Sequence, residues 1–333
     1  MGPLVFEPYL RPMIWGGRRL GERFGKSLPD AGPYGESWEV SAHPHHVSRV
    51  AEGPLKGATL TDLTASHPQE LFGARVPADG AFPLLVKLLD CHELLSIQVH
   101  PDDERARRLT HGRERFGKTE AWVVLEVGPE GKIYSGFKPG VTAQEVERRL
   151  ASGTLEHCLH SYTPKPGDCV FLKAGTVHAV GHGVVMAEVQ QSSDATFRLH
   201  DWDRPGPDGL PRALHISESL ESIDWNAGPV NPVPGAPLSG LPESVYGERL
   251  VTAEPFLLDR YQTSVRFAIP DDGRTTIWLV LDGEGELASQ GGGEPYRRAF
   301  QAGETVLIPA TRGPLAWVPS TAGLLTLLRA TLP

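Results

Sequence analysis

Short apolar runs separated by turn-forming residues dominate the hydrophobic pattern of this chain. Seven of these runs are rich in aliphatic or β-branched residues and are bounded by Gly, Pro or Asp. They cover residues 82–89, 122–127, 169–172, 184–189, 256–261, 276–281 and 305–308. Runs of this length and composition predict β-strands. The 37 glycines and 30 prolines punctuate turns, and they also favour many short strands over long helices.

Helical patterns are few and short. Residues 61–72 predict one or two helical turns that Pro68 interrupts. A second helix is predicted over 101–109, with Pro101 in its first turn ahead of acidic residues. A third is predicted over 142–150, where Thr142 and Glu145 have the spacing of a capping box. These segments do not alternate regularly with the strands, so we do not expect a parallel doubly wound sheet.

A proline-rich segment marks the predicted domain boundary. Residues 226–242 contain five prolines and no apolar periodicity, which is typical of a linker or a long wrapping loop. Segments 167–175 and 303–309 share the order glycine, acid, apolar run and turn, which indicates a weak internal repeat, and a hairpin-like turn is predicted at 282–285. We therefore predict a mainly β fold of two related antiparallel β-barrels with a few short helices. The first domain would span residues 1–235 and the second 236–333.

Charge and cysteine content exclude several classes of partner and compartment. The net charge is −9 and no basic arm is present, so nucleic acid and anionic membranes are poor partners. A small anion would need a local group of Lys and Arg. No apolar run approaches the roughly 20 residues of a transmembrane helix, and Glu7 and Arg11 interrupt the only candidate signal segment. Cys91, Cys158 and Cys169 form no paired pattern, which favours a reducing, cytoplasmic location.

Four residues with nitrogen and oxygen ligand atoms form the sharpest chemical pattern. Gln98 and His100 lie two apart on a predicted strand and share a face, Glu120 lies near the start of the next strand beside Lys118, and His178 follows a turn. In a small closed barrel their side chains would converge on Zn²⁺ or a neighbouring divalent ion. Each histidine alone is more typical of a hydrogen-bonded structural residue, and only the combination favours a metal.

Two further groups are less decisive. Glu188 shares a strand face with Gln190, and Arg198 follows a Ser-Ser-Asp turn that contains Asp194. Polar stretches of this kind beside a turn favour a role in the site, and the alternative is a surface salt bridge between Asp194 and Arg198. Lys87 lies on an otherwise apolar strand, where burial is costly unless the amine faces a polar cavity. This favours Lys87 as a residue that faces a substrate-binding cavity, with Ser96 as a hydroxyl donor, against an edge-strand lysine that reaches solvent. The histidines at 43–46 are expected to face solvent.

Several ordered motifs resemble the type I mannose-6-phosphate isomerases. They are FPLLVKLLD at 82–90, SIQVHPDD at 96–103, GKTE at 117–120, AGTVHA at 174–179 and QSSDATFR at 191–198, with WGG at 15–17 and GESWEVS at 35–41 also fitting. The resemblance spans roughly residues 8–204. It implies a pair of cupin barrels, the first catalytic and metal-binding. The absence of a long helical insertion matches the short bacterial form, although His200 and Trp202 stand where many relatives carry tyrosines.

The same resemblance implies the roles of the site residues. One zinc ion would be held by Gln98, His100, Glu120 and His178. Arg198 would match the essential arginine of the family, and the residues discussed there as acid–base or substrate-contacting groups would be Lys118, Glu188 and Asp194. The second barrel has no His-x-His motif, so we expect it to bind no metal.

The implied activity is interconversion of mannose 6-phosphate and fructose 6-phosphate through a cis-enediol. This chemistry needs a base near C1 and C2 and an electrophile at both oxygens. The ion would polarise O1 and O2, and Arg198 would stabilise the developing enediolate. The proton would be transferred by Asp194, Glu188 or Lys118, and the sequence leaves this choice open. The partner would be a small anionic sugar phosphate, and the protein a monomer or homodimer. The rival interpretations are an isomerase for another sugar phosphate or a free sugar, and a non-catalytic sugar-binding cupin.

Overall fold

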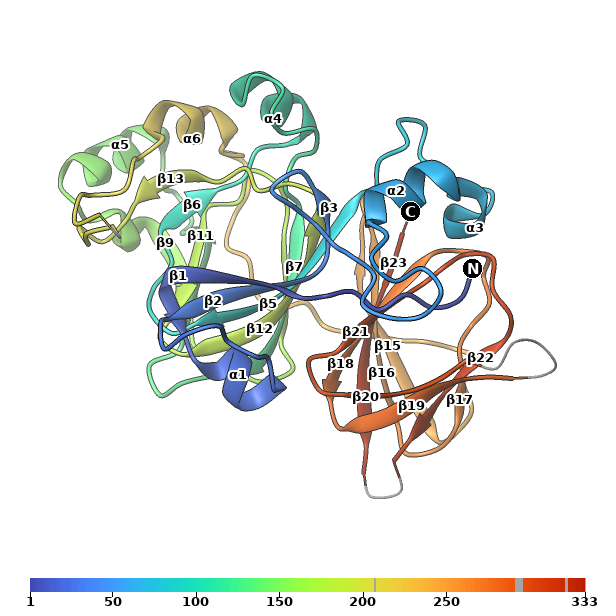
Figure 1. The fold of residues 1–333 in the computed structure, drawn as a ribbon. Helices are drawn as coiled ribbons and strands as arrows, with labels where there is room; N and C mark the ends of the chain where they lie inside the picture. Colours follow the sequence, from blue (N-terminus) through green and yellow to red (C-terminus); the bar gives the residue numbers. More distant parts are fainter. Residues whose placement is uncertain (207, 291–295, 321–322, 333) are drawn as a thin grey trace.

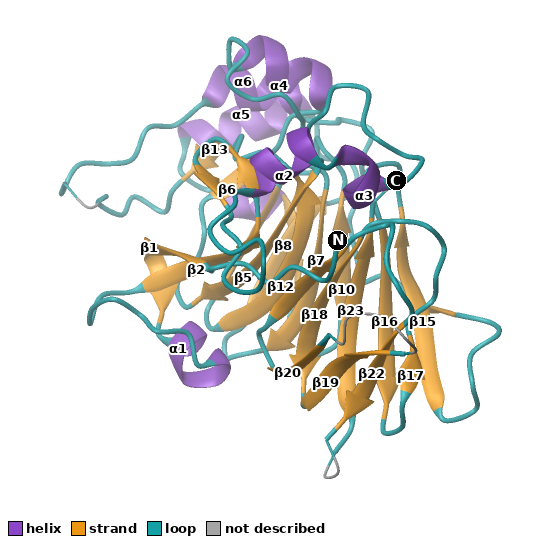
Figure 2. Ribbon diagram, turned by 45° about the vertical axis from the view of Figure 1, so that its right-hand side comes forward, coloured by secondary structure: helices purple, strands orange, loops and turns teal. Residues whose placement is uncertain are grey.

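Strands make up most of this computed structural model, which describes residues 1–206, 208–290, 296–320 and 323–332 (Figures 1 and 2). Residues 9–200 contribute two large antiparallel sheets and one two-stranded sheet. The six-stranded sheet has the order β1 (Tyr9–Gly17), β2 (Tyr34–Val40), β5 (Leu84–Cys91), β12 (Val184–Gln191), β7 (Glu120–Glu126), β10 (Cys169–Leu172). The five-stranded sheet has the order β13 (Phe197–His200), β6 (Ile97–Val99), β11 (His178–Gly181), β8 (Lys132–Phe137), β9 (Leu159–Tyr162).

A second group of strands follows the proline-rich segment. Its six-stranded sheet has the order β14 (Ala236–Pro237), β15 (Val245–Thr252), β16 (Leu257–Thr263), β23 (Leu325–Thr331), β18 (Thr276–Asp282), β21 (Thr305–Ile308). A four-stranded sheet has the order β17 (Phe267–Ala268), β22 (Leu315–Pro319), β19 (Glu284–Ser289), β20 (Arg297–Gln301). The two-stranded sheet in the first part of the chain pairs β3 (Ala42–His43) with β4 (His46–Val47). The prediction of a mainly β, antiparallel, cupin-like fold is therefore confirmed. The domain boundary at 235/236 stays a prediction.

The predicted internal repeat is visible in the strand order. In chain order, β2, β5, β7, β10 and β12 take the same relative positions in their sheet as β15, β16, β18, β21 and β23 take in theirs. The two segments that suggested the repeat form β10 and β21, which are the corresponding edge strands. All seven strands predicted from apolar runs are present, with ends within two residues of the prediction.

The helices are short and lie around the sheets. Figure 1 shows α4 (Asp103–Leu109), α5 (Ala143–Ala151) and α6 (Ile216–Ser222) together at one end of the first group, while α2 (Leu60–Ser66) and α3 (Pro68–Phe72) lie over the second. Pro68 begins α3, as the predicted interruption requires. The helix α1 (Arg19–Phe24), the 3₁₀ helix η1 (Leu155–Cys158) and α6 were not predicted, because none of them begins with a side-chain cap that the sequence could signal.

Two details of helix capping differ from the predictions. Pro101 lies before α4 rather than in its first turn, because the Asp102 carboxylate accepts the Arg105 N–H and so occupies the N-cap. At α5, Thr142 accepts the Glu145 N–H at 3.3 Å, but the Glu145 carboxylate turns to Arg148 and Arg149. Only half of that capping box is formed.

Both faces of the first six-stranded sheet are buried. One face of β12 places Val185, Ala187 and Val189 in a core that also contains Leu279 and Leu328 from the second group of strands. The opposite face carries Met186 and Glu188 toward the five-stranded sheet. The period of two along the strand thus separates an apolar interface from a partly polar interior. The three cysteines are buried and form no disulfide. No helix in the described part of the chain has the length and apolar composition needed to cross a bilayer.

Candidate active site

Three predicted metal ligands meet between the two sheets of the first group. His100 follows β6, Glu120 begins β7 and His178 begins β11. Their candidate ligand atoms lie within 4.8 Å of one another, and all three side chains are buried. Gln98 is the cross-strand partner of His178, and its side-chain nitrogen lies 3.3 Å from His178 Nε2. Rotation of the Gln98 amide by half a turn would bring its oxygen to the same place. The structure therefore brings all four residues together.

The second ring nitrogen of each histidine is held by a backbone carbonyl. His100 Nδ1 donates to Ala195 O at 2.7 Å, and His178 Nδ1 donates to Thr176 O at 2.9 Å. With the proton on Nδ1, Nε2 of each ring carries the lone pair, as in metal-ligating histidines. Burial, with a smaller contribution from the Lys118 charge, lowers the pKa of His100 well below its ordinary value and that of His178 to about 4. Both rings are therefore neutral at pH 7.

The Glu120 carboxylate is buried with too few partners. Its Oε2 accepts a hydrogen bond from the Lys118 ammonium, but Oε1 has no hydrogen-bond partner. Burial raises the pKa of Glu120 to about 8, against the lowering effect of Lys118. A buried carboxylate oxygen without a donor is costly. Two neutral imidazoles and this oxygen form a donor set that suits a divalent cation, so the residues present fit a zinc ion.

A cavity of about 220 Å³ opens beside these groups. Its lining includes the other six residues singled out from the sequence, namely Lys87, Ser96, Lys118, Glu188, Asp194 and Arg198. It also includes Arg11, Met13, Trp15, Glu36, Leu89, Leu95, Gln98, Thr196 and Arg212. Five of the lining side chains are basic and three are acidic. The local positive excess that a small anion requires is therefore present despite the net charge of −9.

Lys87 faces this cavity from the middle of the sheet. It lies on β5 directly opposite Glu188 on β12 and Trp38 on β2. Its ammonium is 3.2 Å from Glu188 and 3.7 Å from Glu36, and only 3% of the residue is exposed. The alternative of an edge-strand lysine that reaches solvent is wrong, since β5 is paired on both sides.

The predicted alternative of an Asp194–Arg198 salt bridge is also wrong. Asp194 pairs with Arg11 at 3.3 Å and with His45 at 3.2 Å. Arg198 Nε instead donates to Ser96 Oγ at 3.2 Å, and Ser96 donates onward to the Gln98 side-chain oxygen at 3.2 Å. Arg198 is thus linked to the group of candidate metal ligands through one hydroxyl.

The expectation that the histidines at 43–46 face solvent fails for His43. This residue is buried, and its Nε2 lies 3.1 Å from Glu114. Glu114 also accepts the Ser193 hydroxyl at 3.2 Å and the Asp194 N–H at 3.4 Å. Glu114 therefore holds the turn whose next residue, Ala195, orients the His100 ring. The sequence carries no local signal for this contact, because the partners lie 71 to 80 positions apart.

Other functional candidates were also missed. Glu36 lies in β2, where its carboxylate accepts from Trp38 Nε1 at 2.6 Å and contacts Arg11 at 3.1 Å. A charged residue within a short apolar-polar alternation, as in GESWEVS, is a signal of the same kind that singled out Lys87. Arg11 and Arg212 lie in segments without such a pattern.

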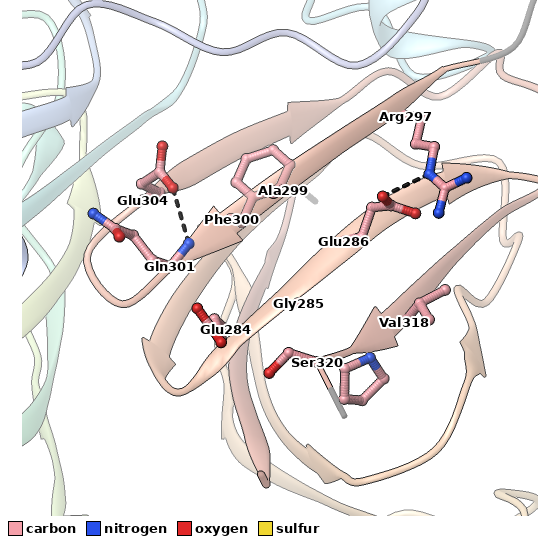
Figure 3. A pocket seen from close by; sticks show the side chains of 11 residues that line it. Glu284, Gly285, Glu286, Arg297, Ala299, Phe300, Gln301, Glu304, Val318 and Ser320 are labelled. Atoms are coloured by element: carbon pink, nitrogen blue, oxygen red, sulfur yellow. Dashed lines mark hydrogen bonds and ion pairs between the residues drawn. The ribbon is translucent and has the colours of Figure 1, made fainter. Parts of the chain in front are cut away.

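A larger hollow of about 480 Å³ lies over the four-stranded sheet of the second group. Figure 3 shows its side chains spread along neighbouring strands, with Arg297 paired to Glu286 and the Gln301 backbone to Glu304. Among the described residues, the candidate metal group found is the one at His100, Glu120 and His178. The metal-free second domain stays a prediction.

Known proteins resemble this chain along nearly its whole length. A family model described as phosphomannose isomerase type I, catalytic domain, matches residues 4–120. The mannose-6-phosphate isomerase of Streptococcus mutans is 36% identical over 93% of this chain and 93% of its own length. A mannose-6-phosphate isomerase of Bacillus subtilis is 34% identical over 92% of this chain and 93% of its own. The crystal structure of mannose 6-phosphate isomerase from Bacillus subtilis superposes with a TM-score of 0.89 at 32% identity and covers 99% of both chains.

Proposed function

The chain belongs to the type I phosphomannose isomerase family, in its short bacterial form, and is a mannose-6-phosphate isomerase by that membership. From this premise we propose that it interconverts mannose 6-phosphate and fructose 6-phosphate through a cis-enediol, with one zinc ion bound by Gln98, His100, Glu120 and His178. The observation that carries the proposal is the unpartnered Glu120 oxygen beside two neutral imidazoles at the end of a basic cavity.

The bound ion would supply Lewis acidity toward two neighbouring sugar oxygens. The remaining chemistry belongs to the side chains of the cavity. Lys87 and Ser96 would contact the open-chain sugar, and Arg198 would place positive charge where the enediolate develops. Arg198 is suited to this role because Ser96 and the Ala213 carbonyl fix its guanidinium group.

Proton transfer between C1 and C2 would fall to Glu188, Asp194 or Lys118. Burial alone would raise the pKa of Glu188, but the charges of Lys118 and Lys87 lower it to about 2. Burial is outweighed in the same way at Asp194, whose pKa is lowered mainly by Lys87 and Arg11. Both carboxylates are therefore ionised and weak as bases at pH 7. Lys118, in contact with Glu120 and 3.0 Å from His100 Nε2, lies nearest to the cluster.

A coupled isomerase assay combined with metal analysis tests the proposal. We expect conversion of mannose 6-phosphate, one zinc per chain, loss of activity after chelation and recovery when zinc is restored. Conversion of a free sugar or another sugar phosphate at the greater rate would favour a related isomerase. Binding without conversion of any sugar would leave a sugar-binding protein and refute the proposal.

A further inference from the structure

The cations that line the cavity differ in how well they are neutralised. Lys118 contacts Glu120 and lies 3.8 Å from Glu188, and Lys87 lies within 4 Å of Glu188 and Glu36. Arg11, on the same side, pairs with Glu36 and Asp194. Each of these three cations has two carboxylate partners. A dianion placed against them would compete with existing ion pairs.

The arginines on the Ser96 side are much less compensated. Arg198 has no carboxylate within 4.0 Å among the described residues. Arg204 and Arg212 share a single carboxylate, Asp201, at 2.8 Å and 2.5 Å. Three guanidinium groups thus face one buried acid. The pKa of Arg198 is lowered by its burial and next by the charge of Arg212, as expected where positive charges gather.

Arg212 is positioned to act with Arg198. Both line the cavity, and Arg198 Nη1 donates to the carbonyl of Ala213, the residue that follows Arg212. Asp201 accepts Arg212 Nε at 2.6 Å as well as Nη2, which fixes the plane of the guanidinium group. Asp201 is itself 6% exposed, so this ion pair is largely shielded from water.

We propose that Arg212, held by Asp201, is the residue that makes this enzyme specific for a phosphorylated sugar, by binding the 6-phosphate while Arg198 stays with the reacting end of the sugar. The inference rests on the proposed function. A sugar with C1 and C2 at the metal-ligand cluster carries its 6-phosphate at the opposite end of the open chain. Hydrogen bonds join Gln98 of the cluster to Ser96, and Ser96 to Arg198. Arg198 in turn donates to the carbonyl of Ala213, which follows Arg212, so Arg212 lies one step further along this chain of contacts. Lys87, with its charge already offset, then contacts the sugar rather than the phosphate.

The charge and shape of the group also match a phosphate monoester. Such an ester carries about −1.5 to −2 at pH 7, and three arginines against one aspartate leave a comparable positive excess. Planar guanidinium groups bind phosphate oxygens through two parallel hydrogen bonds. An uncharged hexose gains nothing from this excess, so the discrimination is built into the site.

Arg212→Gln is the test variant and Arg204→Gln its matched control. Both changes remove one arginine from Asp201, and the two side chains are equally exposed at 18% and 19%, but Arg204 does not line the cavity. In Arg212→Gln, Asp201 keeps Arg204, so we expect the fold to persist. We expect kcat/KM for mannose 6-phosphate to fall roughly 10- to 100-fold, the effect of losing a charge-assisted hydrogen-bond pair. Any turnover of mannose should fall by a much smaller factor than turnover of mannose 6-phosphate, and Arg212→Lys should recover part of the loss.

Binding of inorganic phosphate and of mannose 6-phosphate, measured by calorimetry, separates this inference from the proposed function. If the wild-type protein binds mannose 6-phosphate without converting it, the isomerase proposal is refuted. The role of Arg212 would still be supported if phosphate affinity is lost in Arg212→Gln but not in Arg204→Gln. An unchanged phosphate affinity in Arg212→Gln would overturn that role. An equal loss in Arg204→Gln, or an equal fall for mannose and mannose 6-phosphate, would also overturn it.

Discussion

Replacement of Lys87 by methionine is expected to destabilise the fold by about 3 kcal/mol, because it leaves buried carboxylates without their shared cation. Lys87 is 3% exposed, with Glu188 at 3.2 Å and Glu36 at 3.7 Å. Breaking a buried pair typically costs about 3–5 kcal/mol. Here Glu188 keeps Lys118 at 3.8 Å and Glu36 keeps Arg11 at 3.1 Å, which places the expected value at the lower end.

Urea unfolding followed by tryptophan fluorescence measures this cost. Lys56→Met removes an exposed lysine and should change the free energy of unfolding by less than about 0.5 kcal/mol. Adding Glu188→Gln to Lys87→Met should recover at least about 1 kcal/mol of the summed single effects, because neighbouring charges are coupled. A cost below about 1 kcal/mol for Lys87→Met, or single effects that simply add, would refute the reasoning.

Three further outcomes follow from the site. Burial raises the pKa of Glu120 to about 8, so zinc binding at pH 7 should release a proton. Calorimetry in buffers of different ionisation heat detects this release, and binding heats that do not depend on the buffer would contradict it. Burial lowers the pKa of His178 to about 4, so between pH 6.5 and pH 4 this residue takes up a proton in the unfolded chain but stays neutral in the folded one. The free energy of unfolding of the metal-free protein should therefore fall by up to about 3 kcal/mol over this range. A urea midpoint that does not change with pH would count against this. Arg198→Ala should lower kcat about 100- to 1,000-fold with an unchanged circular dichroism spectrum, and unchanged turnover would remove Arg198 from the mechanism.

Local sequence patterns were sufficient for the strands and for the residues of the candidate metal site. The runs at 169–172 and 305–308 became β10 and β21 without change, because bounded apolar runs have few alternatives to a buried strand. The site was predictable because Gln98 and His100 lie two positions apart, a spacing that places both on one side of a strand. Lys87 was recognisable as a cavity residue because a lone charge on an apolar strand needs a polar environment.

Charge pairing across the cavity was decided by tertiary structure alone. The sequence places Asp194 near Arg198, yet Asp194 pairs with Arg11, which lies 183 positions away, and His43 turns inward to Glu114. Such partners are chosen by how strands from distant parts of the chain align, and no local periodicity records that alignment. The residue types of the site were therefore predictable from short motifs. Which of its charges are neutralised by a partner was decided only by the tertiary structure, because that depends on how the strands of the two sheets align.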